Sequence, residues 1–421
     1  MTSLNVIRKK QGRVRSGQTF MVDYWLLLAV AGLIVLGILM VYSTTFDLGE
    51  RLQDDPTYYI RRQLIALAVG VVCIFVMMRY DYHSLRRISV PLLVGTLLLL
   101  ISVLLFGERI LGARRGLIAG SIQPSEIAKL ATILYISHWL STKGDRIKTL
   151  TYGLLPFAVI TGVVCAFIVL QPDLGTAALI AIIAMILFFV AGADLKQFAI
   201  AGLLGGGIFL ILVTTLPHAA ARIEGFAEAL KDPVQAGWQV QQSVIALGTG
   251  GWFGVGLGES TQKFGPLPAA HTDGVFAILG EELGLFGCLL VIGFLVMLAW
   301  RGIRAALGAR DGYGFLLAIG VTIWLTVQAL LNMAVITAVV PFTGMPLPFM
   351  SYGGSSLFIS LLGVGILLSI SRDATMNIKV QNWKPIRESL RESLDLRRRN
   401  GRSHIPGAGR GRNAPKERMD R

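Results

Sequence analysis

The sequence predicts an all-α, polytopic membrane protein, and three observations support this fold class. Hydrophobic residues make up 54% of the 421 residues and charged residues only 15%, whereas a soluble domain carries roughly a quarter. The apolar residues gather in repeated blocks of about 20 residues, the length that an α-helix needs to cross a bilayer. The 48 glycines suit close packing of membrane helices.

We expect about ten transmembrane helices, an even number that puts both termini on one side. The apolar blocks lie at residues 24–44, 63–80, 88–106, 122–141, 153–171, 174–192, 196–216, 274–300, 312–337 and 353–371. Lysine and arginine concentrate at both ends of the chain and in the connections 79–87, 142–152 and 301–311. The positive-inside rule assigns these parts to the cytoplasm.

The opposite connections are acidic or uncharged, with one exception. The segment 107–121 carries Arg109, Arg114 and Arg115, which suggests that an anion is held there. The longest extracytoplasmic connection, 217–273, lies between the seventh and eighth predicted helices, and long ordered loops are often functional. Within it, the stretch GWQVQQSVIALGTGG suits a short helix, either lying at the membrane interface or forming part of an ordinary loop.

Three regions follow from this pattern. Residues 1–22 form a basic cytoplasmic segment, 23–372 the transmembrane domain, and 373–421 a basic cytoplasmic tail that we expect to be disordered.

The net charge of +14 is also typical of proteins that bind nucleic acids. Basic ends beside membrane spans are instead typical of cytoplasmic placement and contact with anionic lipids, so we expect no nucleic-acid binding.

Ionisable residues inside apolar spans are costly and therefore informative. Glu126 and Lys129 lie three positions apart and share a helix face, which predicts a buried ion pair or a charge pair beside a polar cavity. Asp173 is placed to cap a helix that begins at Leu174. Glu281 and Glu282 fall two turns into the eighth span, so at least one should face the protein interior or a wet cavity.

The stretch PFTGMPLPFMSYGGSS, residues 341–356, carries three prolines and three glycines close to membrane depth. Non-helical backbone is tolerated there only when it is buried in protein or lines a cavity. Ser351, Ser355 and Ser356 could present hydroxyl and N–H donors to an anion, although the stretch also fits a plain turn.

The stretch LPAAHTDG, residues 267–274, places His271 and Asp273 immediately before an apolar run. Spacing alone slightly favours Asp273 as the N-cap of a helix that begins at Gly274. The alternative is a catalytic carboxylate, and one residue could serve both roles. His271 could assist Asp273 or only order the loop, since a neutral imidazole can do either.

Four motifs in register carry a family resemblance. GWQVQQSVIALGTGGWFGVGLGESTQKFGPLPAAHTDGVFAILGEELG, residues 237–284, together with QPSEIAKL, QPDLGTA and LPFMSYGGSS, resembles the SEDS family of shape, elongation, division and sporulation proteins. The likeness covers residues 24–372 and is closer to the division branch than to the elongation branch. Departures at Pro266, Ala269, Gly274, Leu111 and Gly116 affect the expected shape of the acceptor pocket and of the 107–121 loop.

The resemblance implies a peptidoglycan glycosyltransferase that polymerises lipid II on the outer face of the bacterial cytoplasmic membrane and releases undecaprenyl pyrophosphate. The family's essential aspartate maps onto Asp273. Arg114, Arg115 and Lys263 become candidates for diphosphate or donor contact, with His271 and the three serines as further substrate-binding candidates. A divalent cation, Mg²⁺ or Mn²⁺, could assist, but no metal-ligand motif is legible.

The resemblance also implies a class B penicillin-binding protein as partner, together with other division proteins. Three alternatives remain open. A transporter or flippase of a lipid-linked precursor would also have intramembrane charges and broken segments, and an elongation-type polymerase would share most motifs. A scaffold that recruits division proteins through its basic tail would not need Asp273.

Overall fold

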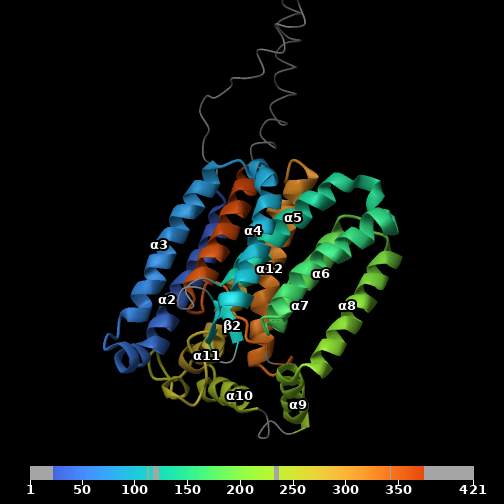
Figure 1. Cartoon of the computed structure of the whole chain (residues 1–421). Helices are drawn as coiled ribbons and strands as arrows, with labels where there is room; N and C mark the ends of the chain where they lie inside the picture. Colours follow the sequence, from blue (N-terminus) through green and yellow to red (C-terminus); the bar gives the residue numbers. More distant parts are fainter. Residues whose placement is uncertain (1–21, 111–112, 117–122, 232–236, 342, 374–421) are drawn as a thin grey trace, which may run out of the picture. The chain divides into compact units, whose positions relative to one another are not determined.

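The computed structural model describes residues 22–110, 113–116, 123–231, 237–341 and 343–373 (Figure 1). The longer helices are α2 (Tyr24–Gln53), α3 (Tyr58–Arg79), α4 (Leu85–Phe106), α5 (Pro124–Lys143), α6 (Leu155–Val169), α7 (Leu174–Val190), α8 (Leu195–Thr215), α9 (Pro217–Lys231), α10 (Trp238–Gly250), α11 (Val275–Leu307), α12 (Gly312–Ile336) and a last helix, Gly354–Asp373. Short helical turns are η2 (Tyr82–Ser84), η3 (Gly144–Lys148), η4 (Leu150–Leu154) and η6 (Gln262–Phe264).

Each predicted span corresponds to a helix, but length and composition mark only eight helices of the described residues as able to cross a membrane. The other two predicted positions are filled by α5, which carries a buried ion pair, and by α7, which has 17 residues. The connection 217–273 contains α10, where a short helix was predicted, and also α9, which the sequence pattern did not reveal.

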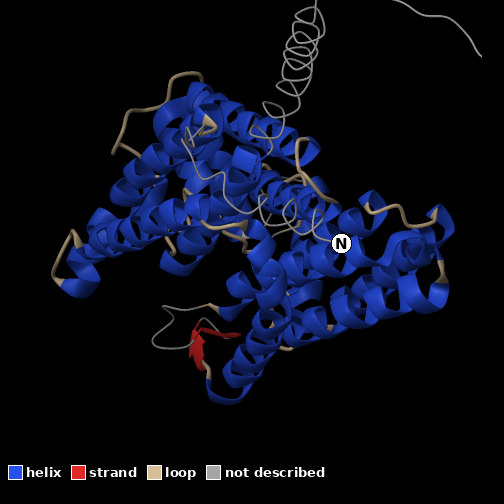
Figure 2. Cartoon of the chain, turned by 90° about the horizontal axis from the view of Figure 1, so that it is seen from above, coloured by secondary structure: helices blue, strands red, loops and turns tan. Residues whose placement is uncertain are grey.

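The all-α fold predicted from the sequence is confirmed, and two short strands are the one departure from helix and loop within the described residues. Two short strands, β1 (Glu108–Ile110) and β2 (Ala113–Gly116), pair antiparallel in the connection after α4, and Figure 2 shows this hairpin in red. Only two residues separate the paired strands in the sequence, a length typical of β-hairpins. The described part of the basic segment 107–121 is therefore a pair of antiparallel strands that follows α4.

The core lies where α11 and α12 pack together and against α2 and α5. Trp324 and Tyr313 are fully buried there. Helix α8 is the most exposed of the candidate spans among the described residues, because only 6% of its most apolar stretch consists of buried residues. In Figure 1 it lies at the right-hand margin of the bundle. Its exposed leucines, such as Leu203 at 77%, suit a hydrocarbon environment, so the helix faces lipid.

Helix α11 is broken at Gly284, where φ is 66° and ψ is −163°. The break frees backbone groups, and the loop 251–256 satisfies them. Val255 N donates to Glu281 O (2.9 Å), Gly256 N to Glu282 O (3.1 Å), and Leu285 N to Gly251 O (2.9 Å). The predicted span 274–300 is thus two helical pieces joined by a positive-φ glycine, and this glycine is buried.

Replacing Gly284 with alanine should destabilise the protein strongly. The backbone conformation is one that glycine alone adopts readily, and an added Cβ would lie 2.4 Å from Gly254 N. We expect a loss of at least about 2 kcal/mol, from backbone strain and overpacking, seen as a lower midpoint of thermal unfolding in detergent. Gly293→Ala is the control, because its Cβ would meet nothing within 4 Å; equal unfolding midpoints for the two variants would contradict the prediction.

Candidate functional site

Asp273 lies, partly buried, in the turn immediately before α11. Helix α11 packs against α10, and Figure 1 shows α9 and α10 at one end of the bundle. The predicted N-cap role is wrong. The helix begins at Val275, and its N-cap residue is Gly274, which has no side chain that could accept a hydrogen bond from the first turn. The preceding turn explains this shift, because Thr272 N and Gly274 N both donate to Ala269 O (3.0 and 3.1 Å) and delay the first helical residue. Asp273 therefore lies one residue outside the helix end.

The backbone on both sides of the Asp273 side chain is fixed by elements distant in sequence. Asn332 of α12 donates through Nδ2 to Asp273 O (2.9 Å), and Ser351 Oγ donates to Thr272 O (2.5 Å). Tyr352 N donates to His271 O (2.9 Å). Hydrogen bonds to consecutive carbonyls leave the position of Asp273 little freedom, which is what a catalytic carboxylate requires.

Two positioning residues escaped the sequence reading. Asn332 and Gln63 are both 2% exposed, and Gln63 bridges Ser351 O (3.3 Å) and Gly353 N (3.2 Å). Both are amides inside apolar spans, a signal that marks functional or structural importance. Asn332 also lies four positions after Gln328, so the two share one helix face.

Ser351 was predicted to present its hydroxyl to an anion, and the structure gives that hydroxyl two internal partners. It donates to Thr272 O and accepts from Leu347 N (2.8 Å), and the residue is 5% exposed. Ser355 and Ser356 lie in the first turn of the last helix, Ser355 partly exposed and Ser356 at 9%. The segment 343–353 thus acts as a clamp on the Asp273 loop.

Removing the Ser351 hydroxyl should loosen this clamp. Ser351→Ala leaves Leu347 N and Thr272 O without their buried partner, which costs about 1–3 kcal/mol. We expect a lower unfolding midpoint and faster amide hydrogen exchange in residues 267–274. Ser355→Ala serves as the control, since no hydrogen bond of its hydroxyl is seen among the described residues. Unchanged exchange in Ser351→Ala would show that the clamp does not depend on this hydroxyl.

His271 lies against two aromatic rings. Its ring centroid is 6.0 Å from that of Tyr352 and 6.3 Å from that of Tyr59, and the two tyrosines meet edge to face at 5.3 Å. Burial lowers the pKa of His271 below its usual range, so the imidazole is neutral at pH 7. These contacts give the ring a role in ordering the loop, and they leave its assistance to Asp273 a prediction.

Lys263 and Glu282, predicted separately, form one buried ion pair. Lys263 Nζ lies 3.0 Å from Glu282 Oε1, and the two side chains are 5% and 0% exposed. The same ammonium donates to Gly258 O (2.6 Å) and Ser43 Oγ (2.9 Å). With three acceptors in place, Lys263 is the counter-ion of Glu282, and a contact with diphosphate would require it to leave this position.

Glu281 is fully buried beside this pair, as the sequence predicted for at least one of the two glutamates. It accepts hydrogen bonds from Ser260 Oγ and from the backbone N and Oγ1 of Thr261 (both 3.0 Å). Such donors stabilise a buried carboxylate. Glu281 therefore ties the loop that carries Lys263 to the first half of α11.

A second buried pair lies in α5. Lys129 Nζ is 2.7 Å from Glu126 Oε1, with both side chains 2% exposed, and it also donates to Gln328 Oε1 (2.8 Å). Gln328 Nε2 continues the network to Pro346 O (2.8 Å). The predicted pairing is thus present and connects α5 and α12 to the 343–353 segment. Asp173 caps α7 as predicted, accepting from Thr176 N (3.2 Å).

Arg114 and Arg115 lie in β2. The strand follows soon after α4 in the chain, but the arginine side chains and residues 117–122 lie outside the described part of the chain.

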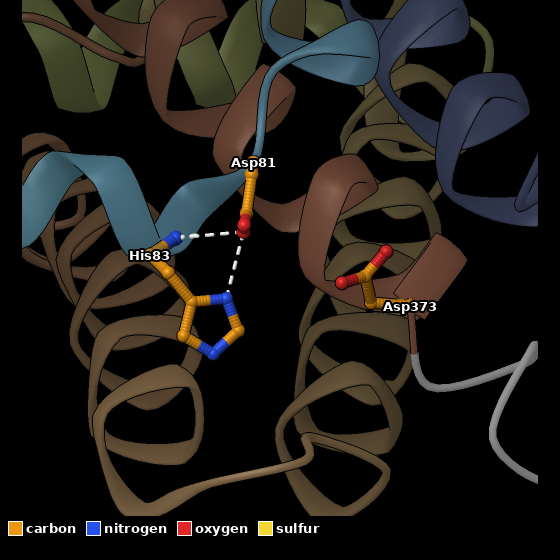
Figure 3. Close-up of side chains that lie close together, drawn as sticks. All are labelled: Asp81, His83 and Asp373. Carbon is orange, nitrogen blue, oxygen red and sulfur yellow. Dashed lines mark hydrogen bonds and ion pairs between the residues drawn. The ribbon is translucent and has the colours of Figure 1, made fainter. Parts of the chain in front are cut away.

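A possible metal group lies at the other end of the bundle. Asp81, His83 and Asp373 bring their ligand atoms within 4.8 Å of one another (Figure 3). Asp81 Oδ1 already accepts from His83 Nδ1 (2.7 Å), and Arg372 and Arg310 lie 3.2 and 3.7 Å from Asp373. The neighbouring guanidinium groups neutralise Asp373, which favours an ion-pair network over a cation site. Within the described residues, no group of three metal-type ligands includes Asp273.

The helical bundle and the clamped acidic loop define a polytopic membrane protein with a candidate catalytic carboxylate at one end. A family model described as "Cell cycle protein", covering FtsW, RodA and SpoVE, matches residues 24–376. The chain belongs to this family.

Curated relatives agree with this assignment. The chain is 42% identical over 353 residues to "Probable peptidoglycan glycosyltransferase FtsW" of Trichlorobacter lovleyi, covering 83% of this chain and 93% of the relative. It is 40% identical to "Stage V sporulation protein E" of Bacillus subtilis, with 83% and 97% covered. The division and sporulation members are thus about equally similar.

Solved structures show the same fold. A chain in "Structural coordination of polymerization and crosslinking by a peptidoglycan synthase complex" aligns with a TM-score of 0.67 and 29% identity, over 84% of this chain and 98% of that one. The rod shape determining protein RodA from Thermus thermophilus aligns with a TM-score of 0.62 and 26% identity, over 85% of this chain and 99% of that one.

Proposed function

We propose that this protein is a peptidoglycan glycosyltransferase that polymerises lipid II on the outer face of the bacterial cytoplasmic membrane and releases undecaprenyl pyrophosphate. The observation that carries the proposal is the Asp273 loop. A partly exposed aspartate, one residue before the N-cap of α11, is held by α12 and the 343–353 segment at one end of a membrane bundle. Similarity to glycosyltransferases over most of the chain supplies the reaction class.

The chemistry assigns a role to Asp273. The 4-hydroxyl of the acceptor GlcNAc attacks C1 of the donor MurNAc, and the C1–O bond to the diphosphate breaks. The hydroxyl loses its proton during attack, and a carboxylate within hydrogen-bond reach can accept it. A lipid-linked sugar is presented at the membrane surface, the level at which Asp273 lies.

The leaving diphosphate needs positive charge to offset its developing negative charge. We assign this role to Arg114 and Arg115 of the β-hairpin, with Ser355 and Ser356 at the start of the last helix as further anion contacts. Lys263 is the weaker candidate, because Glu282 holds it. His271 positions the loop through its contacts with Tyr59 and Tyr352.

A divalent cation, Mg²⁺ or Mn²⁺, fits this site only in part. Mg²⁺ is commonly held by one or two carboxylates together with substrate phosphates. Asp273 could supply one carboxylate and the diphosphate of lipid II the remaining oxygens. The cation would then neutralise charge on the leaving group.

The similar proteins support a proposal for the cellular setting. A partner that cross-links the strands is expected, because one similar structure is a complex of polymerisation and crosslinking; we propose a class B penicillin-binding protein, together with other division proteins. Cell division is the favoured process, with elongation as the alternative branch. We place both termini in the cytoplasm and the Asp273 end outside.

A precursor transporter is the competing function. Purified protein supplied with lipid II, with and without its transpeptidase partner, should yield glycan strands on a gel. The same protein in vesicles should not move fluorescent lipid II between leaflets. Translocation without polymer, in the presence of the partner, would replace the proposed polymerase with a flippase.

A further inference from the structure

A groove lies beside the buried Lys263–Glu282 pair, on the surface that faces the membrane. It has a volume of about 360 Å³, within the usual range for small-molecule sites. One wall is the outer part of α2 and the other is the loop that follows α10. Its lining consists of Leu39, Tyr42, Ser43, Phe46, Asp47, Leu257, Gly258, Lys263 and Phe264.

The rim of the groove is continuous with the lipid-facing surface of α2. Leu39, Tyr42 and Phe46 are 43–49% exposed and lie on one helix face, and Leu28 and Val35 extend the same apolar surface. Across the groove, Leu257 and Phe264 are 55% and 51% exposed. An opening flanked by aromatic and aliphatic side chains on a bilayer-facing helix is accessible to a lipid chain.

The groove has a polar end and an apolar end. Asp47 lies eight residues beyond Leu39, about 12 Å along the helix axis, and the helix then continues with Glu50 and Arg51. The Asp47 end therefore reaches the level of the headgroups, and the Leu39 end lies in the hydrocarbon. An amphiphile aligned with α2 would place its chain against Leu39 and its headgroup at Asp47.

The charges along the groove sum to zero. Asp47 Oδ2 pairs with Arg51 Nε (2.9 Å) at the mouth, and Glu282 pairs with Lys263 at the floor. Because Lys263 already has three acceptors, the floor offers no spare cation to a phosphate. The Asp47–Arg51 pair differs from the buried floor pair because its side chains are 34% and 64% exposed, so a headgroup can exchange with it. A headgroup with one positive and one negative group matches this mouth, with its ammonium at Asp47 and its phosphate beside it at Arg51.

We propose that this groove binds one zwitterionic bilayer phospholipid, of the phosphatidylethanolamine class, with an acyl chain between α2 and the loop 251–264. The proposal does not depend on the glycosyltransferase reaction. The bound lipid would pack against the loop that also carries the Lys263 pair and leads to Asp273.

The test uses the full chain in nanodiscs with phosphatidylethanolamine that carries a photoactivatable acyl chain. Labelled peptides should include 39–47 and 257–264. Leu39→Trp, which fills the groove, should lower this labelling about five-fold, whereas Leu28→Trp on the same lipid face should not. Leu257→Trp fills the groove from the opposite wall. It should lower the labelling in the same way and replaces Leu39→Trp if that variant does not fold. Equal labelling in wild type and both groove variants would overturn the site.

The headgroup assignment has its own test. Excess unlabelled phosphatidylethanolamine should compete better than phosphatidylglycerol in wild type. Asp47→Asn leaves Arg51 unpaired at the mouth and should shift the preference towards the anionic lipid. Glu50→Gln removes the same charge outside the groove lining and should not. Equal competition by both lipids in wild type, or the same shift in Glu50→Gln, would overturn the zwitterionic assignment.

Discussion

Asp273→Asn should abolish glycan strand formation by the purified protein while leaving its fold intact. The side chain keeps its size but loses the ability to accept a proton or hold a cation, and loss of a general base typically costs about 10²–10⁴-fold in rate. The loop should stay in place, because Asn332 binds the backbone oxygen of residue 273 and not its side chain. The measurement is polymerisation of lipid II with the transpeptidase partner present.

The matched control is Asp54→Asn, which removes a carboxylate from the α2–α3 turn at the same end of the bundle. Its rate should equal that of wild type. Thermal unfolding of Asp273→Asn should also match wild type, which separates loss of chemistry from loss of structure. Full polymerisation by Asp273→Asn would remove the catalytic role assigned to this carboxylate.

Lys263→Met should destabilise the protein by about 3–5 kcal/mol, the usual cost of leaving one partner of a buried ion pair uncompensated. Glu282 would keep the hydroxyl of Ser43 as donor, but its charge would be unpaired in a fully buried position. We expect a clear fall in the unfolding midpoint, measured in detergent at pH 7.

The double variant Lys263→Met/Glu282→Gln should recover much of this loss, because no net charge remains buried. Lys148→Met provides the comparison, since the Lys148–Asp145 pair is exposed and exposed pairs contribute at most about 1 kcal/mol. If the stability losses of Lys263→Met and Glu282→Gln, each measured alone, added up to the loss in the double variant, Lys263 and Glu282 would not be coupled. The proposed counter-ion role would then be wrong.

Local patterns predicted the elements of this protein well. Apolar blocks located the helices, a carboxylate before an apolar run located the Asp173 cap, and a three-residue spacing located the Glu126–Lys129 pair. Each of these features depends on residues close together in the chain. The family motifs placed Asp273 in a loop, and the structure explains why the loop is held.

Predictions failed where a non-periodic turn or a contact with a distant segment decides the local structure. The Asp273 cap was wrong because Ala269 O collects two backbone donors and moves the helix start by one residue. The span 274–300 was read as continuous because the pairing of residues 251–256 with 281–286 leaves no periodic trace in sequence. Lys263 was assigned to the substrate because its partner Glu282 lies 19 positions away, where no spacing rule links them.

The break at Gly284 divides α11 into two helical pieces, and the direction in which the side chains of one piece point does not fix that of the other. In an unbroken helix, one inserted residue turns everything beyond it by about 100° and would carry that rotation from the membrane to the helix start. Here the loop 251–256 fixes the backbone up to Phe286 on both sides of the break. A residue gained or lost beyond Phe286 would therefore rotate only the membrane-crossing piece. Relatives could adjust the length of this helix to bilayers of different thickness without moving the aspartate at its other end.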